Sequence, residues 1–241
     1  MTGPVRARPI GFAHRGGAAN RRDQNTLAAF RLSLAMGATG IESDVALTGD
    51  GVPVLVHPGL VARLRRPVSR LVRADLPPHI PALEDVYAEC GPGIDIALDM
   101  TAPAAVDKVV QLARRHGDTS RLWLTYWNVD TVARWRRLYP DVRLVFPTLL
   151  LRERHTARRV EQLRAAGVDA VNLFHRTCTP ARVTSVQAQG LLVFGWGART
   201  GLAARRVLAN GVDGVFCDDT AGMVAALTAE VRRRAAVSGA R

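Results

Sequence analysis

AHRGG at residues 13–17, GIESDV at residues 40–45 and VLVH at residues 54–57 are the three segments that decide the fold of this chain. Together they place two histidines, an arginine and a Glu-x-Asp pair at the ends of apolar runs. Enzymes built as barrels of alternating strands and helices keep their catalytic side chains where the strands end. The three segments therefore predict an active site as well as a fold.

Glu42 and Asp44 lie in the run at 41–47, whose apolar residues predict a strand after a helical segment at 25–36. Side chains two positions apart on a strand point to the same face, so the two carboxylates project together. Two neighbouring negative charges repel each other unless a cation lies between them. A hard divalent ion with oxygen ligands, Mg²⁺ or Ca²⁺, suits this pair. Because Glu-x-Asp is a common pattern, the prediction depends on the residues around it.

His14 ends the short apolar run at 10–13, and the two glycines after Arg15 let the backbone approach a bound group. The guanidinium of Arg15 is a planar set of donors that suits phosphate oxygens. These residues predict a phosphate site at the end of the first strand.

His57 ends a second run, at 52–56, which follows a Thr-Gly-Asp-Gly segment at 48–51 that predicts a tight turn. We expect this run to fold back on the preceding strand as a hairpin, which returns His57 toward Glu42 and Asp44. A lone histidine is more often structural than catalytic. Two histidines that converge on a carboxylate pair and an arginine favour catalysis.

Apolar runs of strand length alternate with segments of helical period along the chain. The runs lie at 10–13, 40–47, 94–99, 121–125, 143–147, 169–173, 191–196 and 213–217, and the helical segments include 104–116, 129–139, 153–166, 180–189 and 201–210. About eight such units predict a single α/β domain over residues 1–241, folded as a (β/α)₈ TIM barrel, and a length of 241 residues is typical of one. The run at 52–56 is assigned to a small hairpin insertion after the second strand.

Active-site side chains are then expected at the carboxyl ends of the strands. The residues at these ends are His14, Glu42, Asp44, Asp99, Tyr126, Thr148, Asn172, Trp196 and Asp218. Asp99 matters most, because it can complete a site of three carboxylates with Glu42 and Asp44. The alternative for Asp99, a helix N-cap or a solvated loop acid, stays open.

The order of these motifs resembles the N-terminal signature of glycerophosphodiester phosphodiesterases: HRG at 14–16, NTLAAF at 25–30, GATGIESDV at 37–45 and TGDGVPVLVH at 48–57. The likeness continues in IPALEDV at 80–86 and GVDGVFCD at 211–218, so it spans nearly the whole chain. Members of that family, like the related phospholipase D-type toxins of spider venom, are metal-dependent (β/α)₈ barrels.

The resemblance implies a role for each candidate residue. Glu42, Asp44 and Asp99 would hold the divalent metal, Mg²⁺ first and Ca²⁺ or Mn²⁺ as alternatives, and Arg15 would bind the phosphate. His14 would act as the base and His57 as the acid, and the two roles can be exchanged. Trp196 would form a wall of the alcohol pocket, although a packing role is an equal alternative. In the family the first nucleophile can be a hydroxyl of the substrate, which gives a cyclic phosphate.

The chain departs from the family pattern at three positions. Gln24 replaces the usual glutamate of the E-N-T motif, and Pro58 follows the second histidine where an aspartate is common. Thr101 stands where a lysine is usual, and a threonine cannot hold a phosphate as a point charge. Another cation must compensate, or the substrate differs. Arginines of the loop after His57 are candidates: Arg63, Arg65 and Arg66.

The formal net charge is +12, yet the basic residues are scattered, so no nucleic-acid partner is expected. Contact with an anionic lipid surface stays open. Cys90, Cys178 and Cys217 form no disulfide or zinc pattern, and no apolar run suggests a leader or a membrane span. A cytoplasmic protein is the expectation.

The sequence therefore predicts a metal-dependent phosphodiesterase that cleaves glycerophosphodiesters or lysophospholipid-like molecules. Two alternatives stay open. One is a diverged member that acts on another phosphate or diphosphate substrate in specialised metabolism, which Thr101 supports. The other is a non-catalytic barrel that binds phosphate ligands, although such a protein has no need of two histidines.

Overall fold

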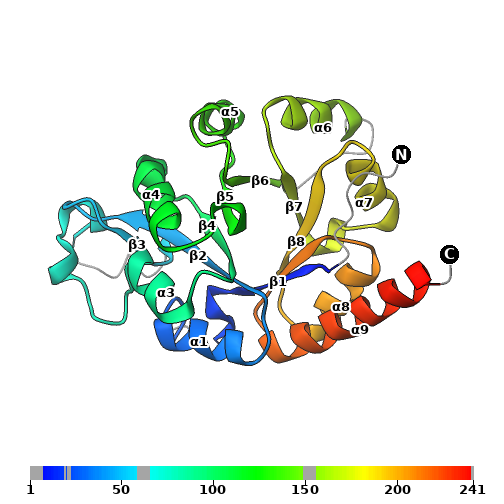
Figure 1. Cartoon of the computed structure of the whole chain (residues 1–241), viewed down its shortest axis with the longest axis horizontal. Coiled ribbons are helices and arrows are strands. Elements are labelled where there is room, and N and C mark those ends of the chain that lie inside the picture. Colours follow the sequence, from blue (N-terminus) through cyan, green and yellow to red (C-terminus); the bar gives the residue numbers. More distant parts are fainter. Residues whose placement is uncertain (1–7, 19, 21–22, 59–65, 149–155, 240–241) are drawn as a thin grey trace.

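Parallel strands close into a barrel in this computed structural model, which describes residues 8–18, 20, 23–58, 66–148 and 156–239 (Figure 1). β1 pairs with β9 on one side and with β2 on the other, which closes the ring. The barrel strands are β1 (Ile10–His14), β2 (Gly40–Leu47), β4 (Asp95–Asp99), β5 (Leu122–Thr125), β6 (Arg143–Thr148), β7 (Ala170–Phe174), β8 (Leu192–Ala198) and β9 (Gly214–Cys217). The predicted (β/α)₈ barrel is confirmed.

β3 (Pro53–Leu55) stands outside the ring as an antiparallel partner of β2, with Val45 opposite Leu55. The turn between the two strands is held by Thr48, whose hydroxyl accepts a hydrogen bond of 2.8 Å from the Val52 amide. Beyond β3, the described residues Val68, Leu76 and Ile80 pack with Val54 and Val56 in a separate small apolar cluster, away from the barrel axis. This is the predicted hairpin insertion.

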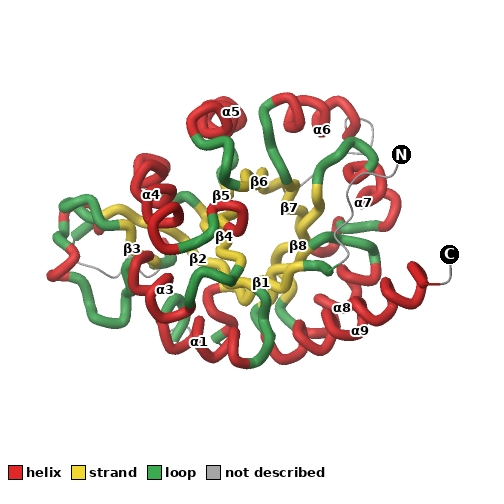
Figure 2. Tube along the Cα trace, in the orientation of Figure 1, coloured by secondary structure: helices red, strands yellow, loops and turns green. Residues whose placement is uncertain are grey.

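Helices surround the barrel and shield the outer faces of its strands (Figure 2). They are α1 (Leu27–Ala35), α3 (Leu83–Cys90), α4 (Val106–His116), α5 (Val129–Leu138), α6 (Thr156–Ala165), α7 (Pro180–Gln187), α8 (Gly201–Ala209) and α9 (Thr220–Gly239). Several begin at side-chain caps: Thr26, Asn128, Thr179 and Thr200 each accept a hydrogen bond from an amide in the first turn. No helix in the described part of the chain is long and apolar enough to cross a membrane.

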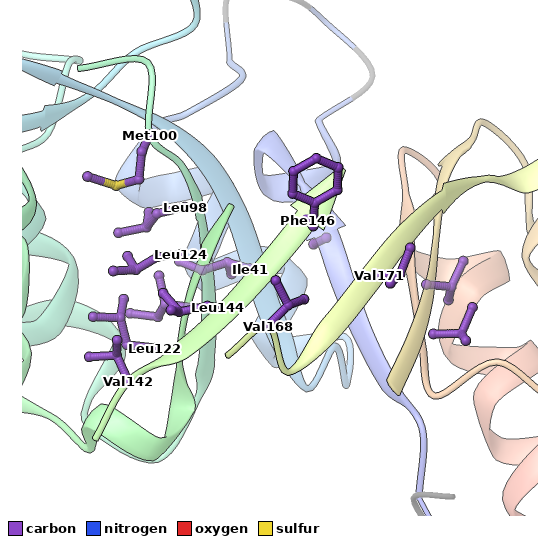
Figure 3. Close-up of a cluster of buried hydrophobic side chains, with 14 of the residues drawn as sticks. Ile41, Leu98, Met100, Leu122, Leu124, Val142, Leu144, Phe146, Val168 and Val171 are labelled. Carbon is purple, nitrogen blue, oxygen red and sulfur yellow. The ribbon is translucent and has the colours of Figure 1, made fainter. Parts of the chain in front are cut away.

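The apolar core has two layers because side chains on a strand alternate between its faces. Outward-facing residues such as Leu98, Leu124 and Leu144 pack together beneath the helices (Figure 3). Inward-facing residues form a second cluster inside the barrel. There the rings of Phe12 and Phe216 stack with centroids 4.6 Å apart.

The inner cluster is an apolar plug on which the polar end of the barrel rests. Phe12 is fully buried, and His14, two positions further along β1, faces the same interior. The same step leads from Phe194 to Trp196 on β8 and from Phe216 to Asp218 after β9. The plug therefore forms the floor of any site at the carboxyl ends of the strands.

Candidate active site

A cavity of about 820 Å³ opens at the carboxyl ends of the barrel strands. Ionisable and aromatic side chains line it together. The ionisable ones include His14, Arg15, Glu42, Asp99 and Asp218, and the aromatic ones include Phe174, Trp196 and Phe216. Most of the site residues that the sequence predicts are therefore brought together in one space.

His14 is held between two carboxylates. Its Nδ1 atom lies 2.5 Å from Oδ1 of Asp218, and its Nε2 atom lies 3.7 Å from Oε2 of Glu42. A carboxylate only accepts hydrogen bonds, so Nδ1 carries the proton and donates it to Asp218. Burial opposes a charge on the imidazole, but Glu42 and Asp218 outweigh it and raise the pKa of His14 above 6.5. The hydrogen bond from His14 in turn lowers the pKa of Asp218.

The backbone after His14 turns sharply and directs the Arg15 amide at the carboxylates. Arg15 has a φ of 52°, and its N–H donates a hydrogen bond of 3.0 Å to Oε2 of Glu42. Gly17 follows with a φ of 61°, and a Cβ there would lie 1.9 Å from Oγ1 of Thr220. The H-R-G-G order thus meets a steric requirement of this turn.

Three acidic side chains from two neighbouring strands lie near the carboxyl end of the barrel, where Glu42 and Asp44 are buried and Asp99 is half-buried. The register sets Glu42 beside His14 and Asp44 beside Asp99. Burial raises the pKa of Glu42 to about 7, that of Asp44 to about 7 and that of Asp99 to about 6. Repulsion adds to burial, because Glu42 raises the pKa of Asp44 and Asp44 raises that of Asp99. This cluster is stable as an anion only with a cation beside it.

The model of the glycerophosphoryl diester phosphodiesterase family matches residues 14–77 and 81–221 of this chain. The chain belongs to this family. The family comprises phosphoric diester hydrolases, so the enzyme class that the sequence predicts is confirmed at that level.

Individual members of this family are similar to the chain over different lengths. A glycerophosphodiester phosphodiesterase of Caldanaerobacter subterraneus subsp. tengcongensis is 24% identical over 233 residues, which cover 86% of this chain and 93% of that protein. Glycerophosphodiester phosphodiesterase 1 of Homo sapiens is 38% identical over 104 residues, which cover 35% of this chain and 31% of that protein. An Oleispira antarctica phosphodiesterase, solved in complex with the product sn-glycerol-3-phosphate, matches with a TM-score of 0.78 and 20% identity and covers 92% of this chain and 97% of that one.

The side chains at this site are of the type that binds a hard divalent metal. All the candidate donors are carboxylate oxygens, and Oδ2 of Asp44 is buried without a hydrogen bond. The nearest cation to that oxygen is Nε of Arg15, at 3.9 Å, and this nitrogen is also buried without a hydrogen bond. Within the described residues no three acidic, histidine or cysteine side chains already converge as metal ligands do. The donor set is therefore present, and its oxygens must close around an ion to form a coordination shell.

His57 is not one of the described residues that line the larger cavity. It follows Val56, whose amide donates a hydrogen bond of 3.0 Å to the Asp44 carbonyl, so the hairpin returns its backbone to the carboxylate cluster as predicted. Its role as an acid stays a prediction.

Thr101 has a structural partner of its own. Its hydroxyl donates a hydrogen bond of 2.6 Å to the Val45 carbonyl of β2. It lines a smaller cavity of about 240 Å³ with Asp99, Tyr126 and Trp127.

The loop that the sequence suggests as a source of compensating cations is described only in part. Arg63 and Arg65 lie outside the described residues, and Arg66 is exposed and is not among the described residues that line the larger cavity. The described cations on the wall of the larger cavity besides Arg15 are Arg176 and Arg199, which follow β7 and β8. The prediction is untested for Arg63 and Arg65, and Arg66 does not line the larger cavity.

Asp218 is the functional residue to which sequence reasoning assigned no role. Its position after β9 and its place in the GVDGVFCD motif are visible in the sequence, but its partner His14 is 204 positions away. The pairing depends on the closure of β9 against β1.

Proposed function

We propose that this chain is a metal-dependent phosphodiesterase that cleaves glycerophosphodiesters or lysophospholipid-like diesters by acid–base catalysis. The single observation that carries the proposal is His14, hydrogen-bonded through Nδ1 to Asp218 and facing Glu42 across the cavity floor. An imidazole fixed by one nitrogen presents the other as a base.

His14 would accept a proton at Nε2 from the attacking oxygen, which belongs to water or to a hydroxyl of the substrate. The new bond to phosphorus forms as the bond from phosphorus to the leaving alcohol breaks. The leaving oxygen takes a proton from His57, whose backbone the hairpin holds beside Asp44. The His57 role rests on the resemblance and on this position. With a hydroxyl of the substrate as nucleophile, the first product is a cyclic phosphate, and with water it is a monoester.

Arg15 would neutralise charge on the phosphate, because its side chain lines the cavity beside the carboxylates. Glu42, Asp44 and Asp99 would hold the metal, with Mg²⁺ as the first candidate and Ca²⁺ or Mn²⁺ as alternatives. When bound, the metal would supply Lewis-acid stabilisation of a phosphate oxygen.

Trp196 would form one wall of the alcohol pocket. Its ring packs against Phe174 at a centroid distance of 5.0 Å, and both rings line the cavity. A non-catalytic phosphate-binding barrel is less consistent with the site, since the pairing of His14 with Asp218 fixes a proton position that binding alone does not require.

The test is turnover of glycerophosphodiesters by the purified protein and by His14→Ala, followed as release of glycerol 3-phosphate. We expect His14→Ala to lower kcat by about 10²–10⁴-fold, the usual contribution of a positioned base. The control is His116→Ala, because His116 pairs with Glu84 on the outside of the barrel. Full activity of His14→Ala would exclude the proposed base.

A further inference from the structure

One wall of the cavity is basic, and it stands opposite the carboxylates. His175 and Arg176 follow β7, Arg199 follows β8, and all three line the same cavity as His14. β7 and β8 lie across the barrel from β2 and β4 (Figure 2). Apart from Arg15 and Asp218, the cavity is therefore polarised, with acidic groups on the side of β2 and β4 and two arginines on the side of β7 and β8.

The positive charges on this wall have little compensation from the protein. Arg199 reaches one carboxylate, with Nε 3.7 Å from Oδ2 of Asp218, and its side chain is 84% exposed. That carboxylate already accepts a hydrogen bond from His14. Arg176 has no ion pair or hydrogen bond with any other residue in the described part of the chain. Guanidinium groups with so few partners in the protein are suited to bind the oxygens of an anion.

Two buried polar atoms on β7 and β8 are also unpaired. Oδ1 of Asn172 and Nε1 of Trp196 are buried without a hydrogen bond, and both residues line the cavity. A hydroxyl group can donate to the amide oxygen and accept from the indole nitrogen. The ends of β7 and β8, which lead to the two arginines, are thus suited to contact a hydroxylated alcohol.

We propose that the β7–β8 wall is a second anion site, in which Arg176 and Arg199 bind a phosphate monoester carried by the alcohol part of the substrate. This inference rests on the function proposed above and narrows its substrate to a diester of a polyol that bears another phosphate. Asn172 and Trp196 would contact the polyol between the two phosphates.

The opposite side of the cavity offers no such site. The smaller cavity beside Asp99 is lined by Thr101, Tyr126 and Trp127, and none of its described lining residues is an arginine, lysine or histidine. An additional anion would be repelled there by the carboxylate of Asp99. The polarity therefore fixes which way a doubly phosphorylated substrate lies.

The test compares two substrates that differ by one phosphate: glycerophosphoglycerol and the same diester with a phosphate monoester on the second glycerol. We expect kcat/KM of the wild-type protein to be about tenfold higher for the phosphorylated diester, as one charge-assisted contact at a partly exposed site provides. The double variant Arg176→Ala/Arg199→Ala should lose this preference. Arg176→Ala alone should lose part of the preference and keep its activity on the plain diester, whereas removal of Arg199 also takes a partner from Asp218. Arg176→Lys/Arg199→Lys should retain part of the preference.

The matched control is Arg205→Ala, on the exposed face of α8 and outside the cavity lining. A wild-type protein without preference would overturn the proposal. An equal loss on both substrates in Arg176→Ala would overturn it as well, because this arginine would then serve the scissile phosphate.

Binding separates this inference from the proposed function if neither diester is cleaved. Calorimetry would compare glycerol 1,3-bisphosphate with glycerol 1-phosphate. About tenfold tighter binding of the bisphosphate to the wild type, but not to the double alanine variant, would support the site. Equal affinities in the wild type would overturn it.

Discussion

His14 acquires its chemistry from residues that lie far away in the sequence. Asp218 fixes its Nδ1 proton, and Glu42 stands opposite Nε2. The sequence predicts all three among the strand-end residues, with His14 and Asp218 closing apolar runs and Glu42 within one. The hydrogen bond between His14 and Asp218 could not be predicted, because the sequence does not show that β9 pairs with β1 on the side away from β2.

Replacing Asp218 by asparagine tests this pairing. A base must be neutral, so activity should rise with pH through the pKa of His14, which lies above 6.5. Asp218→Asn removes an interaction that raises this pKa, so the rising limb should move to lower pH. The plateau of kcat should fall by at least about tenfold, because the ring loses its orientation. The measurement is a pH profile of kcat, with Asp141→Asn as the control, since Asp141 pairs with Arg114 on the surface. An unchanged limb and plateau would show that Asp218 does not position His14.

At the scale of elements, most strands follow directly from the pattern of apolar residues. The expected strand at 40–47 is β2 (Gly40–Leu47), and that at 143–147 is β6 (Arg143–Thr148). The hairpin was predictable because the Thr-Gly-Asp-Gly turn is a local signal. The basic wall was not, because Arg176 and Arg199 follow different strands and share a cavity only through the β7–β8 pairing.

The turn after β1 gives a prediction at this scale. Gly17→Ala places a Cβ 1.9 Å from Oγ1 of Thr220 at a φ of 61°, so it should destabilise the protein and displace the neighbouring Arg15. Gly51→Ala is the matched control, because its φ is 81° but nothing lies within 4 Å of the new Cβ. We expect Gly51→Ala to cost about 1 kcal/mol and to leave activity intact. Gly17→Ala should cost more and should raise KM. Equal melting temperatures and activities for both variants would contradict the steric role of Gly17.

At the scale of the whole molecule, burial of three carboxylates couples stability to pH and to metal. The raised pKa values of Glu42 and Asp44, about 7, and of Asp99, about 6, mean that the metal-free folded state retains protons that the unfolded chain releases near pH 4. The contribution of these three groups to folding stability without metal should therefore be largest at low pH and fall as pH rises toward 7. A bound cation reverses this trend, because it stabilises the ionised carboxylates.

Thermal unfolding in EDTA and in Mg²⁺ tests this coupling. In EDTA, Tm should fall between pH 5 and pH 8, by about 2–4 °C for each kcal/mol lost in a protein of this size. Mg²⁺ should raise Tm at pH 8 and have little effect at pH 5, where the carboxyl groups are protonated. Glu42→Gln removes one ionisable group and should flatten the EDTA profile. A rise of Tm with pH in EDTA would contradict the buried, mutually repelling carboxylates.

The most direct measurement of the central claim is ³¹P NMR of the purified protein with glycerophosphodiesters and lysophospholipids, recorded with Mg²⁺ and again with EDTA. We predict that the diester signal decays only with the metal and is replaced by a monoester or a cyclic phosphate signal. A diester signal that persists for every substrate in Mg²⁺, Mn²⁺ and Ca²⁺ would contradict the assignment of this site as a metal-dependent phosphodiesterase.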